Sequence, residues 1–429
     1  MHQTLVIAKQ TFKESVRNKI LYIFIAFGLV TIFCSAFMPA VSGEKIKIVE
    51  SVCLRSITFF GMLAAILLAS SSIPSDIEDK VLWTITTKPV SQYSFILGKV
   101  TGFVYIIGLL VLILGSASYA LIKVVDSLQK DTEHQGLTAR QMFEPAHLKI
   151  TGKSAKKSGN IHWIEGEKGC ASSWSFTGLE SKNTSDKIVI ESNMFVESRN
   201  NRKKTIPVNV KVVNHFTGES HRETVTVANK KPSFLRWSNE TLGGGKNLTI
   251  VMTPQHSGDF LGIRPDSLRL FLGNKSFEYN FLKGLIVISA QFILMVVIAT
   301  LGSTFFSLPV NILFCLFIFF CGNITDFMRD ISTVITIAGA HEHDHEHGIS
   351  AVVKKPSTFV TLLNSILTAP LTTLSYILPN FKKFNIGNYF IESINIPIKR
   401  IFASFVYMFL YIIFCLPISF IVFRKREFA

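Results

Sequence analysis

The stretch IPSDIEDKVLWTITTKPVSQYSFILGK, residues 73–99, lies between two long apolar runs of a 429-residue chain. The first run covers about residues 56–73, and the second covers about residues 100–122. A helix needs about 20 apolar residues to cross the ~30 Å hydrocarbon core of a bilayer. Both runs are close to that length, so the pattern predicts two membrane-spanning helices joined by a polar loop, residues 74–99.

The whole chain is unusually apolar, with 48% hydrophobic and 17% charged residues, whereas ordinary soluble domains have about 25% charged residues. Four further apolar runs occur, and the six together predict an α-helical integral membrane protein with six transmembrane helices, arranged as three plus three. The further runs are residues 20–38, 285–306, 310–325 and 401–423. The run 20–38 is too long for a signal peptide and lacks a small-residue cleavage site, so we interpret it as an uncleaved anchor.

Basic residues flank the apolar runs at both ends of the chain. Four of them precede residue 20, and Arg424-Lys425-Arg426 follows the last run, leaving a short tail, residues 424–429. Because Lys and Arg near span ends are retained in the cytoplasm, both termini are expected on the cytoplasmic side of a bacterial inner membrane. Alternation then predicts that loop 74–99 is cytoplasmic and that residues 124–282 lie outside.

The segment 326–400, between the fifth and sixth predicted spans, conflicts with a simple alternation. It is expected outside, yet it contains four basic residues, Lys382, Lys383, Lys399 and Arg400. A further span there would place the C-terminus outside. We therefore expect residues 357–378 to form a re-entrant or interfacial helix.

Residues 124–282, between the third and fourth predicted spans, are polar and contain short runs in which apolar and polar residues alternate. This alternation is typical of half-buried strands. The runs are residues 187–192, 206–213, 223–228, 248–252 and 268–272. We expect an extracytoplasmic β-rich domain, a sandwich or jelly roll, large enough to bury its own core. Its first part, residues 126–159, is more polar and rich in Lys, and we expect helix or loop there.

Aromatic and sulfur-containing residues of this β-rich region leave alternatives open. Trp163, Trp174 and Trp237 would either line a sugar-binding face or belong to the core. Cys170 is the single cysteine of residues 124–282, so no disulfide can form within the domain.

Residues 1–19 predict an amphipathic helix that lies in the cytoplasmic membrane interface, because apolar residues recur at helical spacing beside basic ones. The apolar positions are Leu5, Ala8, Phe12 and Val16, and the basic positions are Lys9, Lys13 and Arg17. The alternative is a simple surface anchor without a further role.

Nucleotide hydrolysis by this chain is not expected, because no complete phosphate-binding loop occurs. Gly152-Lys153-Ser154 has His147 where the first Gly of that motif belongs, and Gly244-Gly245-Lys246 is followed by Asn247. No catalytic Ser/His/Asp order or paired-Cys metal spacing occurs either. We therefore expect no enzymatic activity in this chain, and no nucleic-acid partner.

Residues 341–347, HEHDHEH, contain four histidines and three carboxylates. Neutral imidazole is a common ligand of zinc, nickel and copper, so the tract is a candidate site for a divalent metal. Glycines flank this low-complexity tract, which is also typical of a solvated loop. The candidate ligands are His341, His343, His345 and His347.

Charged residues are scarce within the predicted spans. Arg55 and Lys99 lie near span ends, where a long side chain can reach the interface, and Asp326 and Asp330 follow the fifth span. Ion-coupled carriers usually need ionisable groups at mid-depth, so a secondary transporter or channel is disfavoured. Energy for transport would then come from another subunit.

The order of these elements resembles the permease subunits of the type-two ABC exporter family. The loop is similar to the family pattern of an acidic residue, a Thr-rich turn, Pro-Val and Leu-Gly-Lys, here Glu78, Thr84–Thr87, Pro89-Val90 and Leu97-Gly98-Lys99. Other stretches resemble the branch with a large external insert, namely SFEYNFLKG (276–284), STFFSLPV (303–310), ILPNFKKF (377–384) and FRKREF (423–428).

This resemblance implies a permease that pairs with a separate cytoplasmic ATPase, which binds the ATP and Mg²⁺, and with a second permease, identical or different. The substrate is expected to be amphiphilic or related to the cell envelope, and membrane lipid is an expected contact. The residues implied in docking the ATPase are Asp76, Glu78, Asp79, Lys80, Thr84 and Pro89. Two alternatives are a loop that is merely a solvated connection, and a membrane-anchored module that binds glycan or protein without transport.

Overall fold

A computed structural model gives the arrangement of most of the chain in two compact units. The first unit comprises Met1–His134, Phe281–Ile391 and Ile396–Ala429, and the second comprises Gln135–Asn280 and Glu392–Asn395. The described residues are 2–39, 45–78, 91–128, 137, 139–152, 156–158, 161–166, 170–179, 187–198, 205–215, 217–229, 232–238, 247–265, 267–325, 327, 373 and 375–427.

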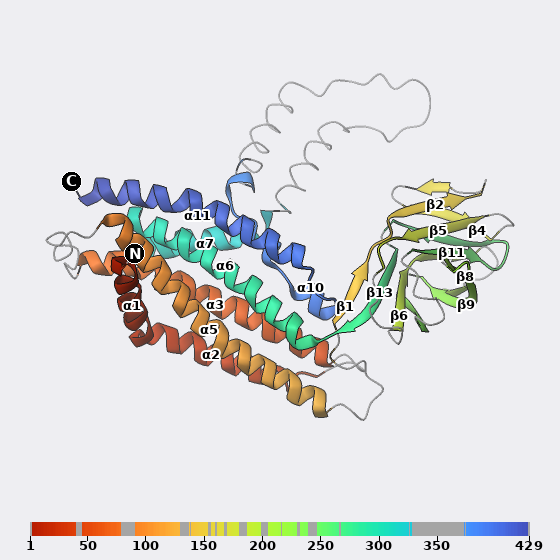
Figure 1. Ribbon diagram of the computed structural model, residues 1–429, viewed down its shortest axis with the longest axis horizontal. Helices are drawn as coiled ribbons and strands as arrows, with labels where there is room; N and C mark the ends of the chain where they lie inside the picture. Colours follow the sequence, from red (N-terminus) through yellow and green to blue (C-terminus); the bar gives the residue numbers. More distant parts are fainter. Residues whose placement is uncertain are drawn as a thin grey trace, which may run out of the picture. The chain divides into compact units, whose positions relative to one another are not determined.

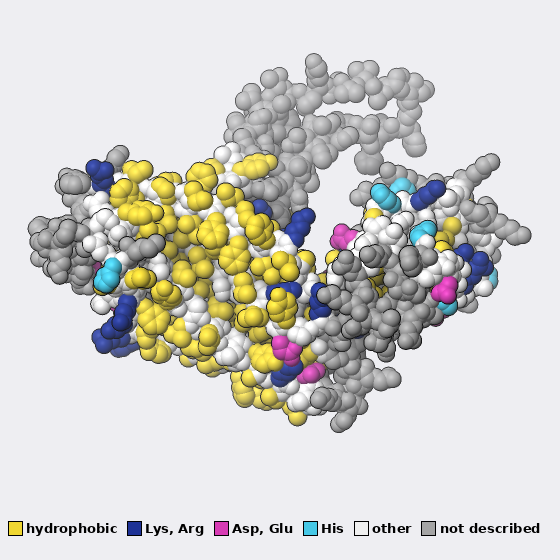
Figure 2. Space-filling view, in the orientation of Figure 1, with side chains coloured by type: hydrophobic (Ala, Val, Ile, Leu, Met, Phe, Trp, Pro, Cys, Tyr) yellow, Lys and Arg dark blue, Asp and Glu magenta, His cyan; other side chains and the backbone are white. Residues whose placement is uncertain are grey.

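The first unit is helical, and several of its long helices run side by side (Figure 1). The helices are α1 (His2–Arg17), α2 (Lys19–Ser35), α3 (Lys45–Glu78), α5 (Gln92–Leu128), α6 (Phe277–Phe305), α7 (Leu308–Asn323), the 3-10 helix η2 (Phe381–Phe384), α10 (Gly387–Ile391) and α11 (Ile398–Glu427). Hydrophobic side chains cover most of the face of this unit seen in Figure 2. An apolar exterior of this kind is suited to contact with lipid tails.

Each of the six apolar runs forms a helix, but they differ in length. Four helices of the described residues are long and apolar enough to cross a membrane: Lys45–Pro74, Gln92–Leu128, Phe277–Phe305 and Ile398–Arg424. The pair α1 and α2, bent by 61°, makes a fifth if it is counted as one span. Helix α7 has only 16 residues, so the predicted count of six is not confirmed.

The bend between α1 and α2 has a local cause at Asn18. This residue has extended backbone geometry, and its side-chain oxygen accepts a hydrogen bond from the backbone N–H of Ile20 at 3.0 Å. It therefore caps α2 and starts a new helix. The chain changes direction there instead of continuing as one rod.

Glycines allow the central helices of the first unit to approach closely. A Cβ atom at Gly115 of α5 would lie 2.7 Å from Cδ1 of Leu285 on α6, and one at Gly61 of α3 would collide with the ring of Phe292. In lipid, helices associate through van der Waals packing and not through the hydrophobic effect, and small residues at a crossing let the two backbones come close enough for that packing.

The second unit consists of β-strands in three antiparallel sheets. The sheet orders are β1-β13-β6-β10, β2-β5-β11-β8-β9 and β3-β4-β12-β7. The strands are β1 (Ala139–Phe143), β2 (His147–Thr151), β3 (Lys156–Ser158), β4 (Ile161–Glu165), β5 (Ala171–Phe176), β6 (Lys187–Asn193), β7 (Phe195–Ser198), β8 (Thr205–Asn214), β9 (Ser220–Ala228), β10 (Pro232–Ser238), β11 (Leu248–Pro254), β12 (Asp259–Ile263) and β13 (Leu268–Lys275). The β-rich region between helices is therefore confirmed.

A single core joins the three sheets. Inward-facing residues from each of them, including Ile190, Ile250 and Leu261, are buried together. Alternate residues of β8 and β11 are buried, as expected for strands with one face on a core. Trp174 is fully buried in this core, and Trp237 packs against it while its Nε1–H donates to Glu223. These two tryptophans therefore belong to the core and do not line a sugar-binding face.

The prediction of helix or loop for residues 126–159 is wrong in part. Helix α5 continues to Leu128, but strands β1, β2 and β3 follow. Each of these strands lies at the edge of its sheet. Strand β3 carries two Lys residues, which discourage pairing with other chains, and β1 lacks a clear alternation. Strand β2 (HLKIT) does alternate polar and apolar residues, so this strand could have been predicted. The segment Glu392–Asn395 also belongs to this unit, where Ile394 forms a parallel bridge with Arg140.

Candidate functional site

A buried ion pair lies at the two ends of the polar loop. Lys99 Nζ of α5 is 2.6 Å from Asp76 Oδ2 of α3, and the two side chains are only 6% and 8% exposed. Glu14 of α1 lies further away, 3.7 Å from the same amine, and is 52% exposed. Three helices thus converge on one cation, and we call Glu14, Asp76 and Lys99 the ion-pair junction.

The junction corrects the expectation for Lys99. The sequence suggested that its side chain reaches the membrane interface, but the amine is buried between helices and faces Asp76. Burial of a charge is costly unless it is paired, so Asp76 provides the compensation that the single sequence could not reveal. The ring of Phe95, one helical turn earlier, lies 5.7 Å from the same amine.

A hydrophobic cluster also joins the two helices at the ends of the loop. Ile73, Phe95, Ile96 and Phe423 are buried together, and the rings of Phe95 and Phe423 stack with centroids 5.7 Å apart. Phe423 lies near the C-terminal end of α11. The two stems of the loop are therefore fixed to each other and to the last helix, a feature that sequence reasoning missed.

Helix α1 packs on α5 through small residues. A Cβ atom at Gly102 would lie 2.6 Å from Cβ of Thr11 and 2.8 Å from the carbonyl oxygen of Ala8. The buried residues of α1 are Ala8, Thr11 and Ser15, whereas Leu5 is 58% exposed. The protein-facing side therefore differs from the predicted apolar stripe: Gly102 of α5 lies in close contact with the small residues Ala8 and Thr11, and Gly98 with Ile7.

The basic residues predicted for this helix are on its free surface. Lys9, Lys13 and Arg17 are exposed, and Phe12 is half-buried. An exposed basic face with exposed Leu5 beside it suits a helix that contacts anionic lipid headgroups.

The predicted docking residues are described only in part. Asp76 is buried in the ion pair, so its side chain is not on the surface, and Glu78 is the last residue of α3. Asp79, Lys80, Thr84 and Pro89 lie outside the described residues, as do His341, His343, His345 and His347 of the His-rich tract and most of residues 357–378. Within the described ranges, no group of three or more His, Cys, Asp and Glu side chains could hold a metal ion.

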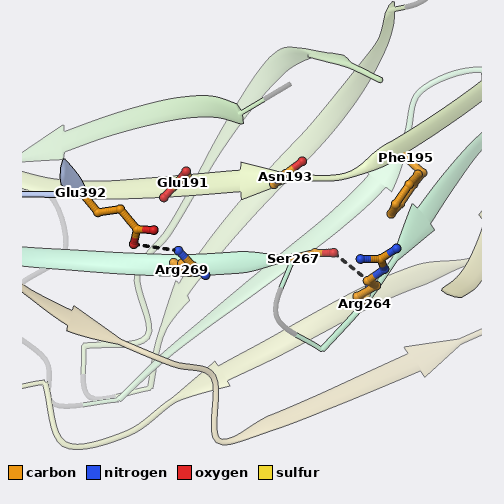
Figure 3. A pocket seen from close by; sticks show the side chains of 7 residues that line it. All are labelled: Glu191, Asn193, Phe195, Arg264, Ser267, Arg269 and Glu392. Atoms are coloured by element: carbon orange, nitrogen blue, oxygen red, sulfur yellow. Dashed lines mark hydrogen bonds and ion pairs between the residues drawn. The ribbon is translucent and has the colours of Figure 1, made fainter. Parts of the chain in front are cut away.

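The second unit has a polar cavity of about 570 Å³ (Figure 3). Arg269 Nη1 donates to Glu392 Oε2 at 3.1 Å, and the guanidinium of Arg264 lies 4.6 Å from the ring centroid of Phe195. Glu191 also lines the cavity, so two arginines and two glutamates balance its formal charge. Donors and acceptors together suit a neutral polar ligand better than an ion.

Comparisons with known proteins leave the family open. No family model matches the chain, and no curated protein matches it. Among solved structures, the CBM22-1 xylan-binding domain from Paenibacillus barcinonensis Xyn10C has 14% identity and a TM-score of 0.20, covering 32% of this chain and 88% of its own. A family GH115 4-O-methyl-alpha-glucuronidase with specificity for decorated arabinogalactans has 10% identity and a TM-score of 0.21, covering 43% of this chain and 28% of its own. At these TM-scores neither similarity supports an inference about this chain.

Proposed function

We propose that the chain is the permease subunit of an ABC transporter, and that its polar loop, within residues 74–99, receives the movement of a separate cytoplasmic ATPase. The observation that carries the proposal is the rigid stem of this loop. Asp76 and Lys99 pair at 2.6 Å at its base, and Phe95 stacks on Phe423. A displacement applied to a loop with such a stem moves whole helices as rigid bodies instead of deforming the loop.

The contacts at the base of the loop connect several helices, so a movement of the loop would be passed to all of them. Asp76 belongs to α3, Lys99 to α5 and Phe423 to α11, and α1 packs along α5 at Gly102. The roles proposed for the loop follow from its charges. Glu78, Asp79 and Lys80 would contact the ATPase, while Thr84 and Pro89 would shape the turn that returns the chain to the membrane.

The transport pathway would form between this chain and a second permease, identical or different, in the bacterial inner membrane. The cargo would be amphiphilic or envelope-related, and the termini would lie in the cytoplasm. The apolar exterior of the helical unit supports contact with lipid (Figure 2). ATP and Mg²⁺ would be bound by the partner ATPase.

Co-purification tests this proposal. The full chain, tagged and expressed from its native locus, is solubilised in mild detergent, and the proteins that remain bound are identified by mass spectrometry. We expect an ABC ATPase subunit in about equal amount, with Mg-dependent ATP hydrolysis by the complex. Absence of any ATPase, together with no ATPase gene next to the gene of this chain, would refute the proposal.

A membrane-anchored module that binds glycan or protein is the second candidate. The balanced polar cavity of the second unit, around Arg264 and Arg269, favours it. The two candidates differ in a direct measurement, because a module of this kind would bind a glycan with no ATPase attached.

A further inference from the structure

A second cavity, of about 220 Å³, lies within the helical unit and combines polar and aromatic walls. Its lining comes from α3, α6 and α7 and from residues 381–388. Arg55, Thr58 and Phe59 of α3 are spaced as residues i, i+3 and i+4, so they share one helix face. We call this cavity the Arg55 cavity.

The arginine is the feature that requires an explanation. Arg55 lies ten residues after Lys45, the first residue of a candidate span, or about 15 Å along the helix. None of the carboxylates in the described parts of the chain forms an ion pair with it. Ionisable residues within a span are expensive, and they usually mark a ligand or ion pathway. Arg55 is exposed at the surface of its helix, whereas Lys99 is buried and paired with Asp76.

A buried amide gives an independent observation. Gln291 of α6 lines the same cavity, is only 4% exposed, and forms no hydrogen bond within the described part of the chain. An amide in an apolar helix bundle is costly without a partner. Its donor and acceptor atoms are therefore available to a molecule that enters the cavity.

The other walls are aromatic. Phe59 is 49% exposed, Phe381 is 1% exposed, and the ring of Phe319 lies 5.8 Å from that of Phe381. A Cβ atom at Gly322 of α7 would collide with the backbone and ring of the segment that carries Phe381. This glycine therefore lets the aromatic wall approach α7.

We propose that the Arg55 cavity binds an amphiphile with an anionic headgroup, a phosphate or carboxylate, and an apolar tail. The guanidinium of Arg55 supplies the positive charge and the donors, and Gln291 adds a further hydrogen bond. Tail groups pack on Phe59 and Phe319. That the bound amphiphile is cargo rests on the function proposed above, whereas the binding itself does not.

The choice of ligand follows from charge and surface. The Arg55 cavity has one charged lining residue, a cation, and no lining carboxylate among the described residues, so an anion is preferred over a cation. Free phosphate would leave the aromatic walls uncovered. A molecule with both a charged head and a tail satisfies both parts of the cavity.

Native mass spectrometry of the purified full chain in detergent tests the proposal. The probes are dioleoyl phosphatidylglycerol, dioleoyl phosphatidylcholine and inorganic phosphate. We expect retention of phosphatidylglycerol, weaker retention of phosphatidylcholine, and no displacement by millimolar phosphate. Arg55→Gln should lower phosphatidylglycerol affinity by about tenfold or more, because a hydrogen bond to a charged group is lost. Arg55→Lys should retain part of the affinity.

The matched control is Arg424→Gln, which removes an exposed arginine at the far end of α11 and should leave binding unchanged. Equal affinity of Arg55→Gln and the unsubstituted protein would overturn the proposal, as would equal retention of the two lipids. Displacement by phosphate alone would overturn the amphiphile assignment. The chain is tested without ATPase, so these results are independent of the co-purification experiment.

Discussion

Replacing Lys99 by Met is the sharpest test of the ion-pair junction. The substitution removes the cation and keeps most of the side-chain volume, so Asp76 stays 8% exposed and loses its ion pair with the Lys99 amine. A buried charge that loses its partner typically costs about 3–5 kcal/mol in the free energy of unfolding. We expect that loss for Lys99→Met and a similar loss for Asp76→Leu.

The double variant gives the decisive comparison. When both charges are replaced by apolar side chains, neither has to be desolvated, and the cost should fall to about 1 kcal/mol or less. Glu14 is 3.7 Å from the amine and 52% exposed, so Glu14→Gln should cost at most about 1 kcal/mol. This variant is the control for a partner that solvent screens.

Unfolding of the purified protein in mixed micelles, followed by loss of helical circular dichroism, measures these differences. The pattern expected is two unstable single variants, a nearly intact double variant and a nearly intact Glu14→Gln. If the double variant were as unstable as the less stable of the two single variants, Lys99 and Asp76 would not act as a pair, and the reasoning would fail.

Three further predictions use other parts of the chain. Gly102→Leu should destabilise the packing of α1 by about 1–3 kcal/mol, because the new side chain would overlap Thr11. Gly108→Ala is the control and should be neutral or stabilising, because nothing lies within 4 Å of the added Cβ. Rates of protease cleavage after α1 compare the two variants, and equal rates would contradict the packing argument. Trp174→Ala should cost about 3–5 kcal/mol because the ring is fully buried, and an unchanged midpoint of β-sheet loss on heating would refute its core role. A peptide of residues 340–348 should bind zinc or nickel more tightly than millimolar in calorimetric titration, and no measurable heat would refute the metal prediction.

Much of the element order can be predicted from the sequence because two simple patterns determine it. Long apolar runs produced helices, and alternation produced the central strands, such as β8 and β11. The edge strands β1 and β3 were not predicted because they are short and lack this alternation. Strand β2 does alternate, but it lies in a polar, Lys-rich segment that resembles a loop as a whole. Helix number is less predictable than helix location, since α7 is apolar but only 16 residues long.

The candidate sites were less predictable because they depend on tertiary partners. The Leu97-Gly98-Lys99 motif contains Lys99, but nothing in one sequence says that Lys99 meets Asp76 and that Gly98 faces α1. Arg55 was noted only as a charge near a span end. Its neighbour Gln291 is more than two hundred residues away in the chain, so the cavity that they share appears only after folding.

Binding of the ATPase to a chain with a charge-reversed loop tests whether this loop is the docking element. The comparison is between the unsubstituted chain and the variant with Glu78→Lys and Asp79→Lys, each purified from the native host with equal expression. Like charges brought together at an interface cost several kcal/mol. The variant should therefore fold normally but retain at least about tenfold less ATPase than the unsubstituted chain. Equal amounts of ATPase on both proteins, or none on either, would contradict the account.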